Sequence, residues 1–380
     1  KIMRIVIDGR MYQESGIGRY IRNLLDNLKK LDERSEYFIL HIKSDYDRLV
    51  YHSNFHKVLA DFRWYGIKEQ IKIPRMLNKL KPDLVHFPHF NLPLFYGGKF
   101  VVTIHDLIHQ HFRMDRATTL NPLTYKLKQL GYNKVFQNAI AKAVKILVPS
   151  SYVKNLLAKE QRIQNEKIVV TYEAVDHKIL SIESKIKISE SMDAVKKFGI
   201  RAPFIFYVGN AHPHKNVEGL IKAFLQLKEK YPQMSLVLSG HDHYFWQRVK
   251  QSLAASPLKK DIIFTGYVSD EELVAFYKNA SCFVMPSFEE GFGIPLLEAM
   301  ACGCPVVSSN TGALEEVGGD AVVYFDPSDL GDMVDKIDKV LSNGNLTNEL
   351  IKKGQKRVKF FSWEKLAKQT MEVYGKCELP

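Results

Sequence analysis

Short apolar segments alternate along the whole chain with longer segments of helical pattern. In the first half, the strand-like segments are 3–8, 37–42, 84–87, 100–105, 145–149 and 168–171. The second half repeats the pattern with 204–209, 235–240, 262–266, 282–286, 305–308 and 321–325. Strands that alternate with helices are typical of α/β proteins whose parallel sheets are covered on both faces. The pattern therefore predicts two doubly wound, Rossmann-like domains.

A chain of 380 residues is longer than one ordinary core, which also favours two domains. We expect them at residues 1–182 and 198–361, because the segment 181–197 is polar, charged and poor in aromatic residues. We interpret that segment as a linker followed by a first helix. In doubly wound sheets, ligands bind outside the carboxyl ends of the strands, so we expect the site in the cleft between the domains.

The segment 285–305 carries the most chemistry in the second half. It reads as the end of a buried strand, a turn with two glycines, and a short helix that a Gly-Cys-Pro sequence ends. The helix is apolar except for Glu298, and a buried carboxylate needs hydrogen-bond donors, such as the two hydroxyls of a ribose. The backbone amides of Gly291, Phe292 and Gly293 lie where a helix N-terminus attracts anions. The segment therefore indicates a site for a phosphorylated, hydroxyl-rich ligand.

Glu290 and Glu298 enclose the sequence Gly-Phe-Gly-Ile-Pro-Leu-Leu. This segment resembles the signature of the retaining GT-B glycosyltransferases of sequence family four, the glycosyl transferases group 1. The resemblance implies an acceptor-binding first domain, a nucleotide-sugar-binding second domain, and a last helix (362–380) packed back onto the first. It implies that Glu290 and the amides of Gly291, Phe292 and Gly293 hold the donor sugar, while Glu298 holds the ribose. A buried loop-to-helix junction with an incidental ion pair is the alternative interpretation.

The segment 209–216 follows the first strand of the second domain and ends in Lys215-Asn216. A lysine just before a helix is well placed as a point charge for a departing diphosphate, although lysine is usually solvated. The resemblance assigns Lys215 to catalysis, and the Lys-Asn ending resembles bacterial surface-polysaccharide transferases, many of which transfer mannose or glucose. Asn210 stands where the family commonly carries an arginine, and His214 or Arg10 are candidates to replace that charge.

Two segments of the first domain also resemble parts of the family's site. Gly16 and Gly18 lie in a strand-to-helix turn, where glycine amides can approach a diphosphate or simply allow a tight turn. His105 closes a strand, and the resemblance places a catalytic histidine there against the donor sugar. We interpret Asp106 as orienting the same loop.

Three further donor-binding residues are expected in the second domain. Val268 resembles part of the loop beside the nucleotide base, and Thr311 and Gly312 resemble a loop near the phosphates. His109 and His111 have no third ligand at metal-binding spacing. Because GT-B transferases generally need no metal, we expect none here.

The formal net charge of +12 is unevenly distributed, since residues 113–159 hold nine Lys or Arg and one acid. Apolar and aromatic residues interleave with these cations. Such a stretch favours contact with anionic lipid headgroups, at about 1 kcal/mol per basic residue near the surface. A solvated, lysine-rich surface is the competing interpretation. No nucleic-acid recognition motif accompanies the charge, so we expect no nucleic-acid partner.

Targeting signals are not visible in the sequence. There is no run of 18 or more apolar residues and no signal peptide. The four cysteines show no metal-ligand pairing and lie mostly in apolar segments. We therefore expect a cytoplasmic protein with buried thiols, located at the inner face of the cell membrane if the basic stretch contacts lipid.

The sequence and the resemblance together predict a retaining hexosyltransferase of polysaccharide or lipid-linked oligosaccharide assembly. GDP-mannose and UDP-glucose are the expected donors, and a lipid-linked saccharide is the favoured acceptor. Neither carboxylate need be a nucleophile, since the resemblance implies that the leaving phosphate accepts the acceptor's proton on the same face. A GT-B phosphorylase or epimerase, and an inactive nucleotide-sugar-binding scaffold favoured by Asn210, remain alternatives.

Overall fold

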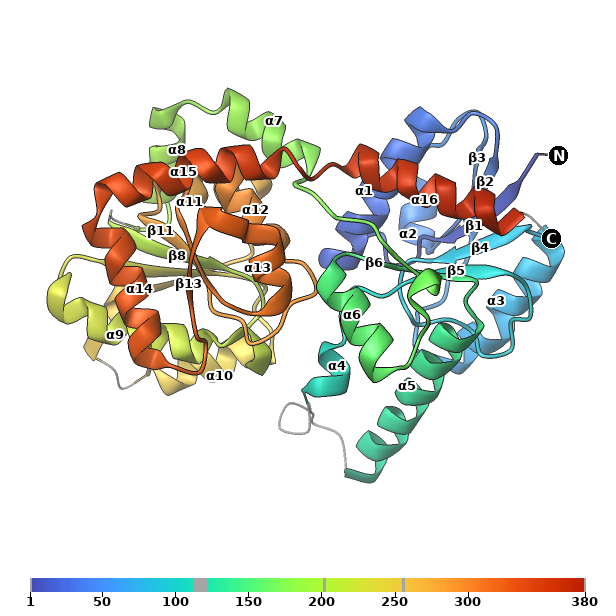
Figure 1. The fold of residues 1–380 in the computed structure, drawn as a ribbon, viewed down its shortest axis with the longest axis horizontal. Coiled ribbons are helices and arrows are strands. Elements are labelled where there is room, and N and C mark those ends of the chain that lie inside the picture. Colours follow the sequence, from blue (N-terminus) through green and yellow to red (C-terminus); the bar gives the residue numbers. More distant parts are fainter. Residues whose placement is uncertain (1, 113–121, 201–202, 255–256, 379–380) are drawn as a thin grey trace. The chain divides into compact units, whose positions relative to one another are not determined.

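The computed structural model describes residues 2–112, 122–200, 203–254 and 257–378. Its contacts divide the chain into two units. The N-terminal unit takes its residues from Lys1–Leu107, Thr118–Glu173 and Ser362–Pro380, and the C-terminal unit from Ile108–Ala117 and Ala174–Phe361. Each unit contains one sheet flanked by helices (Figure 1).

The sheet of the N-terminal unit has the order β3-β2-β1-β4-β5-β6-β7, and neighbouring strands are parallel. Its strands are β1 (Arg4–Asp8), β2 (Glu36–His41), β3 (Phe55–Leu59), β4 (Leu84–Phe87), β5 (Phe100–Thr103), β6 (Lys145–Val148) and β7 (Ile168–Val170). Its helices are α1 (Gly16–Leu31), α2 (Lys43–Arg48), α3 (Ile67–Leu80), α5 (Pro122–Lys142), α6 (Ser151–Glu160), η2 (Asn165–Lys167) and α16 (Trp363–Glu378).

The sheet of the C-terminal unit has the order β10-β9-β8-β11-β12-β13 and is also parallel. Its strands are β8 (Phe204–Val208), β9 (Ser235–Ser239), β10 (Ile262–Gly266), β11 (Cys282–Met285), β12 (Val306–Ser309) and β13 (Val322–Phe325). Its α-helices are α4 (Ile108–His111), α7 (His177–Lys185), α8 (Ile188–Lys196), α9 (Val217–Lys230), α10 (Tyr244–Ser252), α11 (Asp270–Asn279), α12 (Ile294–Ala301), α13 (Gly312–Gly318), α14 (Leu330–Ser342) and α15 (Gly344–Val358). Short 3-10 helices form η3 (Pro213–Lys215), η4 (Pro257–Asp261) and η5 (Gly319–Ala321).

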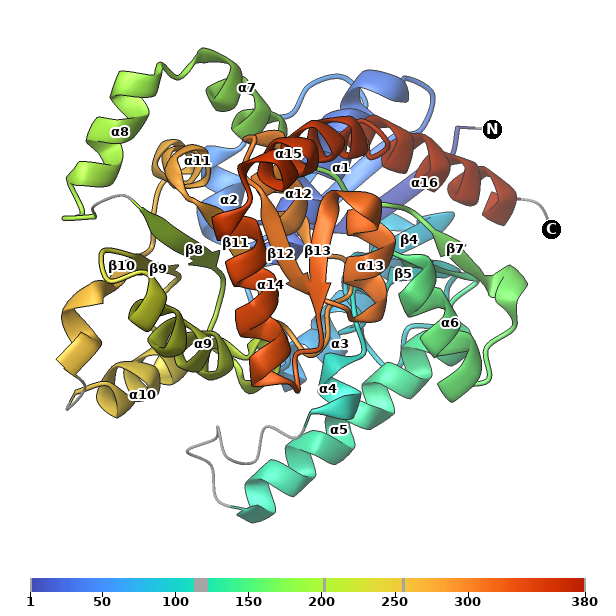
Figure 2. The ribbon, with the colours of Figure 1, turned by 60° about the vertical axis from the view of Figure 1, so that its left-hand side comes forward.

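Both sheets are doubly wound, because the chain starts at an inner strand, adds strands toward one edge, and then returns to build the other. In the C-terminal unit, α9, α10 and α14 cover one face of the sheet, and α11, α12 and α15 cover the other (Figures 1 and 2). With helices on both faces, the strands are buried on both sides, which explains their continuous apolar sequences. Ile5, Val6 and Ile7 of β1 are fully buried, for example.

The strand assignments from the sequence are confirmed, since every segment expected to be a strand forms one. One strand was missed. Strand β3 pairs only with β2 at the edge of its sheet, and most of its residues are only half-buried. Its sequence includes His56 and Lys57 in the middle, so it lacks the apolar run that marks an inner strand.

The segment 181–197 contains the expected helix, α8, but it does not form the expected linker. The segment belongs to the C-terminal unit as the end of α7 and the helix α8, and both helices pack against α11. Lys278 on α11 contacts Glu183 at 2.7 Å, and Asn279 donates to Ser191 at 3.1 Å. The contacts place the division between units after Glu173, earlier than the expected boundary at residue 182.

The last helix, α16, groups with the N-terminal unit and packs against α1. Trp363 is buried, with its ring edge-on to Tyr20 at 6.3 Å, so it acts as a packing anchor. Farther along the helix, the hydroxyl of Tyr374 lies 2.6 Å from Nδ1 of His86 on β4. Ser362 accepts a hydrogen bond from the amide of Lys365, as expected of a helix cap.

The basic stretch 113–159 begins outside the described residues, which resume at Pro122 in α5. Within the second half of α5, Phe136 is buried in the core, and Tyr132 and Val135 pack against it. These interleaved apolar residues therefore have a structural role in their own unit. Across the described part of the chain, no helix is both long and apolar enough to cross a membrane. All four cysteines are buried and free, as expected.

Candidate functional site

The loop between β11 and α12 places the two glutamates of the motif. Gly293 enters the helix with a φ of +101°, and a Cβ there would lie 2.6 Å from Cδ2 of Leu314, so only glycine fits. The helix is buried on nearly all sides and ends at Ala301, and Gly303, two residues later, has a φ of +72°. The sequence interpretation of a buried, glycine-terminated helix is therefore confirmed.

Lys215 and Glu290 form an ion pair in the C-terminal unit. The Nζ atom of Lys215 lies 2.7 Å from Oε1 and 2.8 Å from Oε2 of Glu290. Ser287 Oγ donates a third hydrogen bond to Oε1 at 2.6 Å. Glu290 is buried, whereas the side chain of Lys215 is 18% exposed. The pair joins two candidate residues that are 75 positions apart in the sequence.

Backbone and hydroxyl contacts hold these loops in place. The amide of Phe288 donates to the carbonyl of His214 at 2.7 Å, which ties the loop after β11 to η3. Ser309, at the end of β12, donates to the carbonyl of Ser287. Its hydroxyl also lies 3.3 Å from that of Thr311. The carboxyl ends of β8, β11 and β12 thus supply one connected set of loops.

Glu298 lies on α12 and is only 1% exposed. The hydroxyl of Tyr277, on α11, donates to its Oε2 at 3.2 Å. A buried carboxylate is costly unless donors surround it, so this hydroxyl accounts for part of its stabilisation. Glu298 is therefore far less accessible than Lys215, the partner of Glu290.

A second acid of the loop, Glu289, contacts α4. Its Oε2 lies 2.7 Å from Nδ1 of His111, and Phe112 packs its ring 5.8 Å from that of His214. These contacts attach α4 to the C-terminal unit, although the neighbouring strand in the sequence, β5, belongs to the other. His111 therefore has a carboxylate partner, Glu289. The described residues include no group of three or more His, Cys, Asp or Glu side chains placed to hold a metal ion.

Neither candidate replaces the arginine that Asn210 displaces. Burial and then the charge of Lys215 lower the pKa of His214 to about 2, so this imidazole is neutral. Arg10 lies in the N-terminal unit, where Asp8 and Glu69 neutralise its charge. Asn210 itself accepts a hydrogen bond from the amide of His212 at 3.2 Å, which shapes the loop.

The remaining candidates of the C-terminal unit flank this loop set. Val268 is buried, and it follows Tyr267, whose exposed ring stacks 4.6 Å from that of His241. Thr311 precedes α13, and Gly312 is the first residue of that helix. Their contact with a donor stays a prediction.

Gly16 and Gly18 of the N-terminal unit differ in whether packing requires glycine at their positions. A Cβ on Gly18 would lie 2.5 Å from the carbonyl oxygen of Tyr12, so packing alone requires glycine there. A Cβ on Gly16, the first residue of α1, would meet nothing within 4 Å. Gly16 thus has space beside it for a ligand, while Gly18 has a structural explanation.

His105 is held by two acceptors of the N-terminal unit. Its Nδ1 lies 3.1 Å from Oε1 of Glu173, and its Nε2 lies 2.9 Å from the carbonyl of Pro88. Since both partners are acceptors, both hydrogen bonds form when both ring nitrogens carry protons, so these contacts favour the charged imidazole. Burial alone would lower the pKa of His105, but the hydrogen bond and charge of Glu173 outweigh it and raise that pKa. The surroundings of the ring therefore favour its charged form.

Sequence reasoning missed three partners of the candidate residues. Ser287 stands three positions before Glu290 in the same motif, so its position was a usable signal. Tyr277 and Glu173 are far in sequence from Glu298 and His105, and nothing local marks them.

Two protein families match this chain. Residues 15–179 match the family described as Glycosyltransferase Family 4, and residues 190–357 match that described as Glycosyl transferases group 1. The O-antigen chain mannosyltransferase B of Escherichia coli is 29% identical over 96% of this chain and 96% of that protein. The serotype-specific mannosyltransferase WbdA of Escherichia coli is 28% identical over 76% of this chain, which corresponds to 34% of that protein.

Solved structures share the architecture. The crystal structure of the Anabaena protein Alr3699/HepE in complex with UDP-glucose has a TM-score of 0.76 to this chain. The comparison covers 98% of this chain and 100% of that one, at 16% sequence identity. At that identity, the likeness concerns the fold.

Proposed function

Because this chain belongs to the family four glycosyltransferases (glycosyl transferases group 1) and has the GT-B fold, we propose that it transfers a hexose from a nucleotide-diphosphate sugar to a saccharide acceptor. The transfer retains the configuration of the anomeric carbon and needs no metal ion. Similarity to the O-antigen chain mannosyltransferase B over nearly the whole chain supports mannose, and hence GDP-mannose, in polysaccharide assembly. UDP-glucose, the ligand in the complex of HepE, is the second candidate donor.

The observation that carries this proposal is the pair of Lys215 and Glu290 with Ser287. It sets a cation and a carboxylate side by side in one unit, which also holds a second buried carboxylate, Glu298. Together they offer the partners that a sugar diphosphate requires: a cation for phosphate oxygens and acceptors for sugar hydroxyls.

Lys215 stabilises the departing diphosphate in this proposal. Its ammonium group has three N–H donors, and two contact Glu290, so one is left for a phosphate oxygen. Before the donor binds, Glu290 and Lys215 keep each other's charge balanced in a buried site. When the donor binds, Glu290 and the amides of Gly291, Phe292 and Gly293 hold its sugar. The diphosphate then takes over part of the lysine's coordination.

Glu298 holds the ribose of the nucleotide. Its carboxylate accepts a hydrogen bond from Tyr277, and because a carboxylate can accept several hydrogen bonds, the two ribose hydroxyls are suitable donors. Val268, Thr311, Gly312 and Asn210 complete the donor site in this proposal.

In this proposal the N-terminal unit holds the reacting end of the acceptor. Gly16 and Gly18 are candidates to contact the diphosphate through their amides, and His105 is the candidate to face the donor sugar. The leaving phosphate takes the proton of the attacking hydroxyl on the same face. A lipid-linked acceptor would bring the protein to the inner face of the membrane, which the nine basic residues of 113–159 support.

Release of nucleotide diphosphate tests the proposal and separates its alternatives. GDP-mannose and UDP-glucose are each incubated with the protein, with and without a mannose-containing oligosaccharide. A transferase releases nucleotide diphosphate in an acceptor-dependent way. A phosphorylase instead converts the oligosaccharide and inorganic phosphate to a sugar 1-phosphate without release of nucleotide diphosphate, an epimerase converts the donor sugar without release, and a scaffold binds the donor without turnover. Absence of acceptor-dependent release with both donors, in protein that binds them, would reject the proposal.

A further inference from the structure

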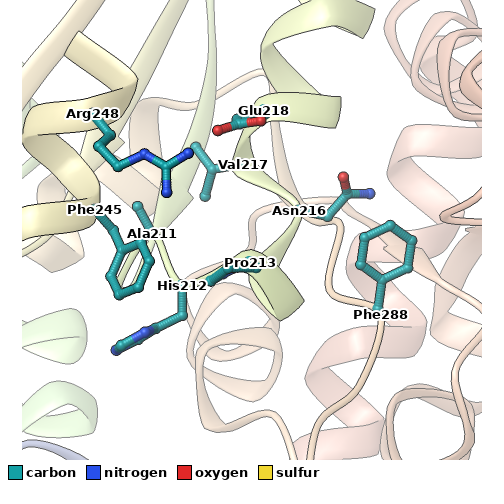
Figure 3. A pocket seen from close by; sticks show the side chains of 9 residues that line it. All are labelled: Ala211, His212, Pro213, Asn216, Val217, Glu218, Phe245, Arg248 and Phe288. Carbon is teal, nitrogen blue, oxygen red and sulfur yellow. The ribbon is translucent and has the colours of Figure 1, made fainter. Parts of the chain in front are cut away.

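A hollow of about 260 Å³ lies in the C-terminal unit beside the loop that carries Lys215. Figure 3 shows its side chains, which come from the segment 211–218, from α10, and from Phe288 in the loop after β11. None of the residues assigned to the donor lines it. We infer that this hollow binds one neutral hexose unit of the saccharide chain that the protein extends, an inference that rests on the proposed transfer to a saccharide.

The size of the hollow suits a single ring. Ligand pockets for drug-sized molecules have volumes of roughly 300–1,000 Å³, so this one lies just below that range. A nucleotide sugar, with a base, two sugar rings and a diphosphate, is too large for it. One six-membered sugar ring is the natural occupant of that volume.

The charges around the hollow favour a neutral ligand. Arg248 of α10 and Glu218 of α9 both line it, and within the described residues neither forms an ion pair. An anion would be opposed by the carboxylate, and a cation by the guanidinium. A ring with several hydroxyl groups suits both, because each hydroxyl can accept from Arg248 and donate to Glu218.

The rest of the lining suits the apolar face of a sugar ring. Phe245 and Phe288 lie at opposite ends of the hollow, and Pro213 and Val217 lie between them (Figure 3). Phe288 is 37% exposed, so part of its ring is accessible to a ligand. The ring of His212 packs 4.5 Å from that of Phe245. Burial and the charge of Lys215 lower the pKa of His212 to about 4, so this ring adds an aromatic surface without a charge.

Saturation-transfer NMR with methyl α-D-mannopyranoside tests the inference on the full chain. The experiment is run with GDP and UDP present in excess, so that the donor site is occupied. We expect saturation transfer to the mannoside under these conditions. Phe288→Ala and Glu218→Ala are expected to weaken its binding about tenfold or more, since each removes a direct contact. Phe95→Ala and Glu229→Ala are matched controls, an exposed aromatic and an exposed acid on α9, and should not change it.

Three outcomes of the binding experiment overturn the inference. Absence of transfer means that the hollow holds no hexose. Complete displacement of the mannoside by nucleotide means that the sugar binds in the donor site. Equal binding in wild type, Phe288→Ala and Glu218→Ala, or equal loss in the controls, places the sugar elsewhere on the surface. Donor turnover is measured on the same samples. Turnover of the donor by a protein that does not bind the mannoside refutes only the inference about the hollow. Mannoside binding without turnover with either donor refutes only the proposed function.

Discussion

Each unit holds a cation against a buried carboxylate near the carboxyl end of a strand, but the two cations differ in freedom. In the N-terminal unit, Arg10 donates to Asp8 through Nε and Nη2, and Nη2 also contacts Glu69. Asn91 donates to both oxygens of Glu69, and Arg10 is only 2% exposed. In the C-terminal unit, Lys215 has one carboxylate partner and an accessible side chain.

The difference shows how similar chemistry serves two purposes. The planar guanidinium of Arg10 is fixed between two acids, so the cluster resembles a structural ion network. The lysine is a flexible point charge with a donor to spare, which is what a transient ligand requires. Arg10 should therefore matter to stability and Lys215 to turnover.

Loss of the arginine should give the largest effect. Arg10→Ala leaves Asp8 and Glu69 buried without a cation, and we expect the free energy of unfolding to fall by about 3–5 kcal/mol. Denaturant unfolding measures this value. Arg4→Ala is the control, because it breaks an exposed pair with Glu36 and should cost less than about 1 kcal/mol. Equal stability of the two variants would remove the contrast between the clusters.

Loss of the lysine should act mainly on catalysis. Lys215→Ala is expected to lower turnover on the order of 10²–10³-fold, because a preorganised charge on the leaving group is lost. Its stability should fall less than that of Arg10→Ala, since Ser287 still donates to Glu290. Lys222→Ala, at an exposed position of α9, is the matched control. Turnover near that of wild type in Lys215→Ala would exclude the lysine from the mechanism.

The buried acid of α12 should affect nucleotide binding. Glu298→Gln keeps the shape of the side chain but replaces an acceptor-only carboxylate by an amide. We expect the affinity for nucleotide diphosphate to fall about tenfold or more by titration calorimetry. Tyr277→Phe removes one donor to this carboxylate and should weaken binding less. Unchanged affinity in Glu298→Gln would reject the ribose assignment.

The pair of His105 and Glu173 should give the smallest effect, a change in stability that depends on pH. Because the folded protein raises the pKa of His105, its pairing with Glu173 stabilises fully below about pH 6.5, the pKa of an unfolded histidine. That contribution disappears as the pH rises through the higher, folded-state pKa. Glu173→Gln should therefore lower stability by about 1 kcal/mol more at about pH 5.5 than at about pH 9. A pH-independent difference would show that His105 is not charged.

The sequence predicted the architecture well because buried parallel strands are continuous apolar runs. It failed at β3, an edge strand with polar residues, and at 181–197, whose two helices carry few apolar residues because they cover the outside of α11. The need for glycine in the motif was predictable, since the positive φ and close packing at Gly293 admit no other residue.

The site was predictable only in part. The motif at 285–305 identified Glu290 and Glu298, and the segment 209–216 identified Lys215. The pairing of Lys215 with Glu290 depends on the fold, which brings the ends of β8 and β11 together. The pairing of Arg10 was not predictable, because one of its two carboxylate partners, Glu69, lies 59 residues away along the chain. Whether a cation is available to a ligand is decided by partners that the local sequence does not reveal.

A structure determined with nucleotide diphosphate bound tests the central claim most directly. Our account predicts ribose hydroxyls within hydrogen-bonding distance of the Glu298 carboxylate, and a phosphate oxygen at Nζ of Lys215. A nucleotide bound elsewhere, with Lys215 still closed on Glu290 and Glu298 enclosed by protein groups alone, would contradict it.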